Sequence, residues 1–399
     1  MNFDTPIDRR GTGALKWENV RNAAGKREVI PLWVADMDFA PPDAVLAAIR
    51  GRAEHPIFGY TNADPAYFEA LRSWYRTRYG ASVGREAFMI GPGLIPSLGI
   101  ALRALTAAGE GVIVMPPVYH PFFQIVEDND RVVVEAPLRR VHGRGYELDL
   151  EGARGAVAAA AGRGIRTTAM LFSSPHNPGG RVWSADELRS LLDFAAEAGI
   201  SIVADEIHGD IIAGNRAFAS LAAFPGAPER TVVLSAPNKT FNLAGLHLSH
   251  FVAESEEIRS RLRRGISAAG YSQPNVLSQT AALAAYREGG PWLDDLIEYL
   301  RGNLGYAVEF LNTRIPGVSA AFPEGSYLIW TEVAELAARK GLQDDRDLAL
   351  RLEDEGRVKV TAGSVFGTGG RSFIRINVAC PRAILAEGLA RFEAWANGG

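Results

Sequence analysis

The sequence predicts an α/β protein with a large domain, in which helices flank a mostly parallel sheet, and a smaller α+β domain. In the middle of the chain, short apolar runs typical of strands alternate with segments of helical periodicity. These runs are apolar throughout, which favours parallel strands covered on both faces. The last third has a different pattern, with one long helical segment followed by short strand-like runs.

The elements of the large domain are predicted in chain order from these runs. Between the second and third runs, the segment "SADELRSLLDFAAEAG" has helical spacing of apolar residues from Leu188 to Ala195. Ser184 and Glu187 have the spacing of a capping box, and Gly199 is a suitable helix end. The predicted strands are residues 111–115, 167–174, 200–206 and 231–236.

The smaller domain is predicted from a long helix over 290–312 and a strand over 372–379. We expect residues 1–50 to form an N-terminal segment that joins the small domain, 51–285 to form the large cofactor-binding domain, and 286–399 to form the small domain.

Composition excludes several classes of function. The chain has 399 residues, is 47% hydrophobic and has a net charge of −4, so nothing favours binding to nucleic acid or anionic lipid. No apolar run has the length of a membrane span, and the N-terminus shows no export signal. The single Cys380 is expected to be a buried, inert thiol. We therefore expect a soluble cytoplasmic protein without nucleic-acid or membrane partners.

Polar side chains follow three of the predicted strands. Asn177, Asp205 and Lys239 each come shortly after an apolar run, and ligands of such sheets gather beyond the carboxyl ends of the strands. Singly, each residue has an ordinary structural interpretation as a turn former, a cap or a surface lysine. Their shared position at one edge of one sheet predicts a binding site.

Together these residues have the chemistry that pyridoxal phosphate requires. Its aldehyde needs an amine, which Lys239 supplies, and its ring nitrogen needs a carboxylate, which Asp205 supplies. Asn177 has an amide for the ring oxygen, and Tyr119 has a flat ring to stack on the cofactor. The glycine turn at residues 91–102 enters a helix and can bind the phosphate.

The substrate of such a site is predicted to be an amino acid. Its carboxylate would be bound by an arginine in a bidentate manner, and Arg375 is the candidate.

Several motifs, in this order and spacing, resemble those of the fold-type I pyridoxal-phosphate-dependent enzymes, from about Phe3 to Arg382. The branch that the chain resembles is the cystathionine β-lyase, or C–S lyase, group of the MalY/PatB type. His208 occupies the place of a tyrosine found in many aminotransferases, which also indicates the lyase branch. The motifs are "PLWVADMDFAPP", "FGYT", "PPVYHPFF", "SSPHNPGGRVW", "ADEIHGD", "SAPNKTFNLAGL" and "GSVFGTGGRSFIRINVACPR".

The resemblance implies a role for each matching position. Lys239 would be the Schiff-base lysine and the catalytic base, Asp205 the partner of the pyridinium nitrogen, and Arg375 the ligand of the substrate carboxylate. It further implies a homodimer with shared active sites. The other implied contacts are Asn177, Tyr119 and His208 at the ring, Leu94, Ile95 and Ser235 at the phosphate, Tyr60 at the phosphate of the neighbouring subunit, and the Ala35–Asp36 loop with Asn177 beside the substrate.

Three positions depart from the pattern of the relatives at the phosphate end. Asn238 stands where relatives usually have serine, and Ala236 stands in place of the phosphate-binding serine of typical aminotransferases. His247 replaces an arginine that many aminotransferases have eight residues after the lysine. Ser235 is the candidate to substitute for the missing hydroxyl.

The predicted function is that of a C–S β-lyase that cleaves cystathionine or related cysteine thioethers to pyruvate, ammonia and a thiol. A pyridoxal-phosphate-dependent aminotransferase remains an alternative, because both reactions use the same first steps. A second alternative is a regulatory protein that keeps the fold. No metal site is expected, since neighbouring side chains of "DEIHGD" diverge.

Overall fold

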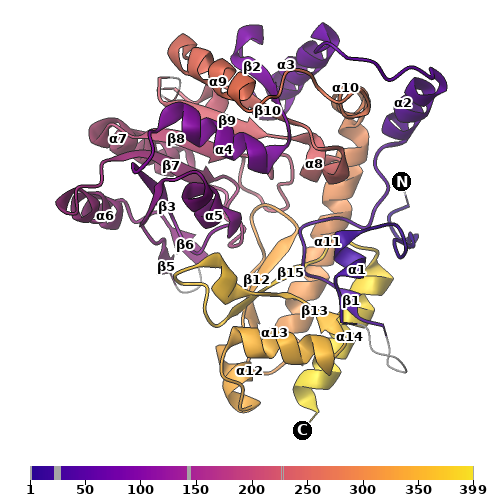
Figure 1. Cartoon of the computed structure of the whole chain (residues 1–399). Helices are drawn as coiled ribbons and strands as arrows, with labels where there is room; N and C mark the ends of the chain where they lie inside the picture. The colour runs from indigo at the N-terminus through magenta and orange to yellow at the C-terminus, as the bar shows by residue number, and fades with distance from the viewer. Residues whose placement is uncertain (1, 22–27, 142–144, 226, 228, 399) are drawn as a thin grey trace.

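The computed structural model of the chain describes residues 2–21, 28–141, 145–225, 227 and 229–398. A large sheet with its helices packs against a smaller sheet, and the N-terminal segment lies beside the C-terminal part of the chain (Figure 1). Within the described ranges, every helix is too short or too polar to cross a membrane.

Seven strands form the large sheet, in the order β2-β10-β9-β8-β7-β3-β4. They run parallel except for β10, which is antiparallel to both β2 and β9. The mostly parallel sheet predicted from the sequence is therefore confirmed. The strands are β2 (Phe88–Gly91), β3 (Gly111–Val114), β4 (Val132–Glu135), β7 (Thr167–Ser173), β8 (Ser201–Asp205), β9 (Thr231–Ser235) and β10 (Ser249–Val252).

Helices cover both faces of this sheet, as apolar strands require. Successive residues of β3 belong to different cores, since Val112 and Val114 pack on one face and Ile113 on the other. The first face is covered by α4 (Leu94–Leu105), α5 (Pro121–Asp128) and α9 (Glu256–Ala268). The second face is covered by α6 (Leu150–Gly162), α7 (Ala185–Ala198) and α10 (Val276–Glu288), with α2 (Asp43–Glu54) and α3 (Pro65–Tyr79) packed against α10.

Helix α7 begins and ends as its sequence predicts. The Ser184 side chain accepts a hydrogen bond from the backbone of Glu187, and the Glu187 side chain accepts one from the backbone of Ser184. Gly199 ends the helix with a φ of 68°, a conformation that glycine adopts without strain. The predicted capping box is confirmed, and it fixes the connection between β7 and β8.

The smaller sheet is antiparallel, in the order β11-β12-β15-β14. Helix α11 (Gly290–Arg314) leads into it and confirms the long helix predicted over 290–312. Its strands are β11 (Ser319–Ala320), β12 (Leu328–Glu332), β14 (Thr361–Ala362) and β15 (Phe373–Asn377), and its helices are α12 (Ala334–Arg339), α13 (Asp345–Asp354) and α14 (Arg382–Asn397).

The N-terminal segment contributes to a separate two-stranded sheet. Its strand β1 (Ile30–Pro31) pairs in parallel with β13 (Val358–Lys359), and the short helix α1 (Leu15–Glu18) precedes it. The remaining elements are the hairpin of β5 (Arg139–Val141) and β6 (Gly145–Glu147), the helix α8 (Pro237–Thr240), and the 3-10 turns η1 (Arg85–Ala87), η2 (Leu221–Ala223), η3 (Ala244–Leu246) and η4 (Gly363–Phe366).

Candidate active site

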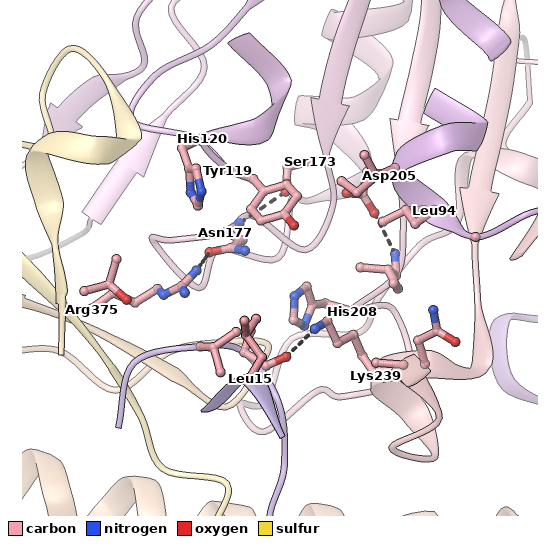
Figure 2. A pocket seen from close by; sticks show the side chains of 18 of the residues that line it. Leu15, Leu94, Tyr119, His120, Ser173, Asn177, Asp205, His208, Lys239 and Arg375 are labelled. Atoms are coloured by element: carbon pink, nitrogen blue, oxygen red, sulfur yellow. Dashed lines mark hydrogen bonds between the residues drawn. The ribbon is translucent and has the colours of Figure 1, made fainter. Parts of the chain in front are cut away.

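A cavity of about 700 Å³ lies beyond the carboxyl ends of the central parallel strands. Side chains from the large sheet, from β15 and from the N-terminal segment converge on it (Figure 2). Eight of the predicted site residues line this cavity, namely Leu94, Ile95, Tyr119, Asn177, Asp205, His208, Lys239 and Arg375.

We use the name strand-end wall for Asn177, Asp205 and Lys239. Strands β7, β8 and β9 are parallel neighbours, so their carboxyl ends lie at the same edge of the sheet. Asp205 is the last residue of β8, Asn177 follows β7, and Lys239 lies in α8, directly after β9. Local sequence at three strand ends therefore brings these three side chains together.

The amine of Lys239 is partly buried in this wall and points toward the N-terminal segment, where it donates a hydrogen bond to the carbonyl oxygen of Ala35 (Figure 2). Burial, with a smaller contribution from the charge of Arg375, lowers the pKa of Lys239 to about 8, and the carboxylates of Asp36 and Asp205 oppose this shift. An amine with a pKa near neutrality is available as a nucleophile and as a base.

The carboxyl group of Asp205 is buried at the other side of the cavity. Burial raises its pKa to about 7. Two smaller effects oppose this rise: the hydrogen bond that its Oδ1 accepts from the Ile207 backbone at 3.1 Å, and the charge of Lys239. A buried acid of this kind gains from a cationic partner inside the cavity.

Arg375 projects from β15 on the opposite side of the cavity. Its Nη1 donates to Oδ1 of Asn177 at 2.9 Å, and its Nη2 donates to the carbonyl oxygen of Trp33 at 3.1 Å. Burial lowers its pKa to about 10, so the guanidinium stays charged at neutral pH. Because Oδ1 of Asn177 accepts from Arg375, the amide nitrogen of Asn177 is left to donate into the cavity.

Two ring systems complete the centre of the site. Burial, together with the charges of Lys239 and Arg375, lowers the pKa of His208 to about 3, so its imidazole is neutral. Its Nδ1 is buried without a hydrogen-bond partner among the described residues. Tyr119 follows β3 and presents its ring to the cavity, and burial raises its pKa to about 12.

The rim of the cavity has the features of an anion site. Helix α4 begins after Gly93, whose φ of 110° is accessible to glycine, and no side chain caps its first turn. Leu94 and Ile95 line the cavity there, together with two of the three residues that depart from the pattern of the relatives, Asn238 and His247. Oδ1 of Asn238 is buried without a partner in the part of the chain that the structure describes. Free backbone N–H groups at a helix start attract phosphate.

Three predicted site residues do not line the cavity. The hydroxyl of Ser235 donates a hydrogen bond to the backbone oxygen of Glu206 at 3.4 Å, and Asp36 forms an ion pair with Arg9 at 2.7 Å. Tyr60 is 98% exposed on the surface of the single chain. The phosphate contact of Ser235, the substrate contact of Asp36 and the intersubunit contact of Tyr60 stay predictions.

A second face of the cavity, which we name the N-terminal wall, is defined as Leu15, Trp33, Val34 and Ala35. Of these residues, only Ala35 was expected near the substrate. Contacts distant in sequence hold this wall in place: Nζ of Lys16 forms a buried ion pair with Asp38 at 2.7 Å. Nε1 of Trp33 donates to the backbone oxygen of Lys16 at 3.0 Å. The cavity is also lined by Ser173, His120, Thr361 and Val365, none of which was predicted.

A signal for some of these missed residues exists in the chain. Ser173 ends β7 within the motif that carries Asn177, and Trp33 lies in "PLWVADMDF". No comparable pattern marks Leu15, because its place at the cavity depends on tertiary contacts alone.

The acidic and histidine residues of "DEIHGD" diverge, but only Asp205 belongs to strand β8 and the other residues form the turn after it, so the alternation expected from a strand is not the cause. Asp205 and His208 face the cavity, whereas the carboxylate of Glu206 accepts hydrogen bonds from Ser220 and Leu221. Asp210 accepts from Trp74, Tyr79 and Thr240. Across the described ranges, no group of three or more His, Cys, Asp or Glu side chains is arranged to hold a metal ion.

Comparison with known proteins gives consistent results over the length of the chain. The family described as aminotransferase class I and II matches residues 27–392. Cystathionine beta-lyase PatB of Bacillus subtilis is 37% identical, over 99% of both chains. Protein MalY of Escherichia coli is 31% identical, over 98% of this chain and 97% of its own. The structure of the PLP-bound C–S lyase from Staphylococcus hominis superimposes with a TM-score of 0.90 and 31% identity, over the whole of both chains.

Proposed function

This chain belongs to the aminotransferase class I and II family, and we propose that within it the protein is a pyridoxal-phosphate-dependent carbon–sulfur β-lyase that acts on cysteine thioethers. The observation that carries the proposal is one cavity that holds a buried carboxyl group, Asp205, and an amine of lowered pKa, Lys239, beside an uncapped helix start. The names of the relatives PatB and MalY and the C–S lyase structure support the lyase reaction.

The residues of the cavity fit the cofactor. Nδ1 of His208, Oδ1 of Asn238 and Nε of Arg375 are buried polar atoms without hydrogen-bond partners among the described residues. Such atoms are costly in a folded protein unless a ligand or water satisfies them. Lys239 would hold the cofactor aldehyde, Asp205 its ring nitrogen, and the start of α4 its phosphate. When bound, pyridoxal phosphate supplies an electron sink for a carbanion at the substrate Cα.

The remaining steps depend on side chains of this chain. Arg375 would bind the α-carboxylate of the amino acid, and Asn177, hydrogen-bonded to Arg375, would keep the guanidinium in place. With the carboxylate fixed at one side, the Cα–H bond is directed toward Lys239 on the other. A free amine with a pKa of about 8 can accept that proton at neutral pH.

The net reaction is an α,β-elimination followed by hydrolysis. The Cα–H and Cβ–S bonds break, the sulfur leaves with the electron pair of the Cβ–S bond, and it gains a proton to become a thiol. The three-carbon fragment takes up one water and releases ammonium and pyruvate. No external oxidant, reductant or keto acid is needed.

A pyruvate-release assay over a panel of cysteine thioethers tests this function. We expect pyruvate and thiol in equal amounts without an added keto acid. Conversion of the cofactor to its amine form, with turnover only when a keto acid is supplied, would instead assign the protein as an aminotransferase. Purified protein that stays colourless after pyridoxal phosphate is added would favour the regulatory alternative.

We also propose that the enzyme is a cytoplasmic homodimer in which Tyr60 of one copy reaches the phosphate of the other. Ile57, Phe58 and Tyr60 are 66%, 55% and 98% exposed, so they form an apolar surface segment that a second copy would cover. Tyr60→Phe should weaken cofactor binding about tenfold without changing the dimer, because a single hydroxyl contact is lost. Fluorescence titration with pyridoxal phosphate and analytical ultracentrifugation measure the two effects. Unchanged cofactor affinity, or a monomer in both proteins, would contradict the proposal.

A further inference from the structure

We propose that the N-terminal wall binds the sulfur substituent of the substrate, and that the enzyme prefers cysteine thioethers with uncharged, apolar S-substituents over cystathionine. This inference rests on the proposed β-lyase function and specifies its substrate class. It follows from the distribution of charged and apolar side chains around one cavity.

The charged groups of the cavity all have a role in binding the cofactor or the α-carboxylate of the substrate. Histidines apart, the only charged side chains that line it among the described residues are Asp205, Lys239 and Arg375. Under the proposed function, these serve the ring nitrogen, the aldehyde and the α-carboxylate. Cystathionine carries a second ammonium and a second carboxylate on its distal carbon. Both would have to leave water without a complementary charge, which is unfavourable.

The N-terminal wall has no proposed role in binding the cofactor, and its side chains are apolar. Leu15, Trp33 and Val34 line the cavity from the N-terminal segment, and Val365 lines it from η4. Leu15 is 56% exposed and lies beside the cavity (Figure 2). Its neighbours Lys16 and Trp17 both donate hydrogen bonds to the Asp38 carboxylate, at 2.7 and 3.0 Å.

An exposed leucine alone carries no functional meaning. This one is held by a buried ion pair at the mouth of a cavity whose neighbouring residues are also apolar. A substrate chain that extends from Cβ toward this wall would cover the exposed side chain and gain the free energy of apolar burial.

Cations outside the cavity are engaged elsewhere. Nζ of Lys359 lies 4.8 Å from the centre of the Trp33 ring, donates to the backbone oxygen of Asn19 at 2.6 Å and pairs with Glu353 at 3.4 Å. Nε of Arg346 donates to the hydroxyl of Ser364 at 2.8 Å. Neither side chain lines the cavity, so neither is placed to bind a distal carboxylate.

A second copy would not supply the missing charge through its exposed segment. Residues 55–62, "HPIFGYTN", contain no Asp, Glu, Lys or Arg. In the proposed dimer, this segment therefore adds aromatic and aliphatic surface to the site.

A matched pair of substrates tests the inference on the cofactor-loaded enzyme. S-butyl-L-cysteine resembles cystathionine in chain length but lacks the distal ammonium and carboxylate, and both substrates release an alkyl thiol. We expect kcat/KM for pyruvate release to be about tenfold or more higher for S-butyl-L-cysteine. An equal or higher value for cystathionine would overturn the inference and leave the β-lyase function intact. Absence of pyruvate from both would contradict the proposed function itself.

Two further measurements assign the effect to the wall. In the series from S-methyl- to S-butyl-L-cysteine, kcat/KM should rise about threefold for each added methylene. Leu15→Ala should reduce the ratio between the S-butyl and S-methyl values about fivefold. The control is Ile7→Ala, which alters an aliphatic residue that is 45% exposed but does not line the cavity. If the two variants keep the same ratio, Leu15 has no part in binding the substituent.

Discussion

The two walls of the cavity reach their positions by different means. In the strand-end wall, Asn177, Asp205 and Lys239 each lie at or shortly after the end of one of three adjacent parallel strands. In the N-terminal wall, the residues are positioned by contacts between distant segments. The Trp33 backbone oxygen, for example, accepts a hydrogen bond from Arg375, 342 positions further along the chain.

Local sequence patterns therefore specify the strand-end wall, whereas contacts between distant segments specify the N-terminal wall. The strand-end wall carries the chemistry, and its arrangement follows from strand order and a few local turns. The N-terminal wall carries the proposed selectivity, and its arrangement requires the packed protein. Substitutions in the two walls should therefore have distinguishable effects on turnover and on substrate preference.

Lys239→Ala is expected to have the largest effect. Loss of the amine removes both the covalent attachment and the base, so pyruvate release should fall by roughly 10³-fold or more for every thioether. The yellow absorbance of the bound cofactor should disappear, while the oligomeric state stays unchanged. Steady-state assays, absorbance spectra and gel filtration measure these outcomes. The control is Lys340→Ala, whose amine contacts the backbone at the C-terminus instead. Retained turnover in Lys239→Ala would refute the role of this wall in the chemistry.

The sequence predicted the fold and the strand-end wall because both depend on local patterns. Apolar runs, the capping box at Ser184 and the glycine turn before α4 identify elements whose order specifies a parallel sheet. The antiparallel strand β10, at Ser249–Val252, was not predicted, because its short length and its histidine give no clear pattern. The domain boundaries stay a prediction.

The rest of the site could not be predicted for a physical reason. Lys16 has no exposed surface, but a lysine in "LKWE" looks like a residue on a solvated helix face. Its ion pair with Asp38 and its hydrogen bond to the backbone oxygen of Asp36 at 3.0 Å make its burial favourable, and both depend on how the segment folds back. Likewise, Ser235 has a suitable hydroxyl, but this hydroxyl donates a hydrogen bond to the backbone oxygen of Glu206, and the residue does not line the cavity.

Lys16→Met addresses the N-terminal wall and should have the next largest effect. The substitution leaves Asp38 buried with one fewer cation, and Arg9 at 2.9 Å compensates only in part. We expect the free energy of unfolding to fall by roughly 3 kcal/mol. Preference for S-butyl- over S-methyl-L-cysteine should also weaken, because Leu15 loses its support.

Urea unfolding and the substrate ratio measure these two outcomes. The matched control is Arg21→Met, which removes an ion pair with Asp354 whose partners are 57% and 47% exposed. Its effect on stability should stay below about 1 kcal/mol. Equal destabilisation by both variants would mean that the buried pair does not support the wall.

The smallest expected effect concerns the charge of Asp205 when the cofactor is removed. Because burial raises the pKa of this carboxyl from 3.8 to about 7, folding favours its neutral form. The contribution of this group to stability is complete below about pH 4 and is lost as the pH rises through about 7. Glu206 next to it has a pKa raised to about 8 for the same reason, whereas the charge of Lys239 opposes the shift at Asp205.

Asp205→Asn isolates the effect of the Asp205 charge on stability, because the amide carries no charge and keeps an oxygen that can accept from the Ile207 backbone. Without cofactor, the variant and the wild type should melt at similar temperatures at about pH 4, whereas the variant should be more stable by on the order of 4 kcal/mol at about pH 8. With cofactor, the order should reverse at about pH 8, since only the carboxylate can pair with a cationic ring nitrogen. Asp193→Asn, on the exposed side of α7, should show neither pH dependence nor reversal. If the variant gains stability equally with and without cofactor, Asp205 does not pair with a cationic ring nitrogen. The strand-end wall would then not bind the cofactor in the proposed way.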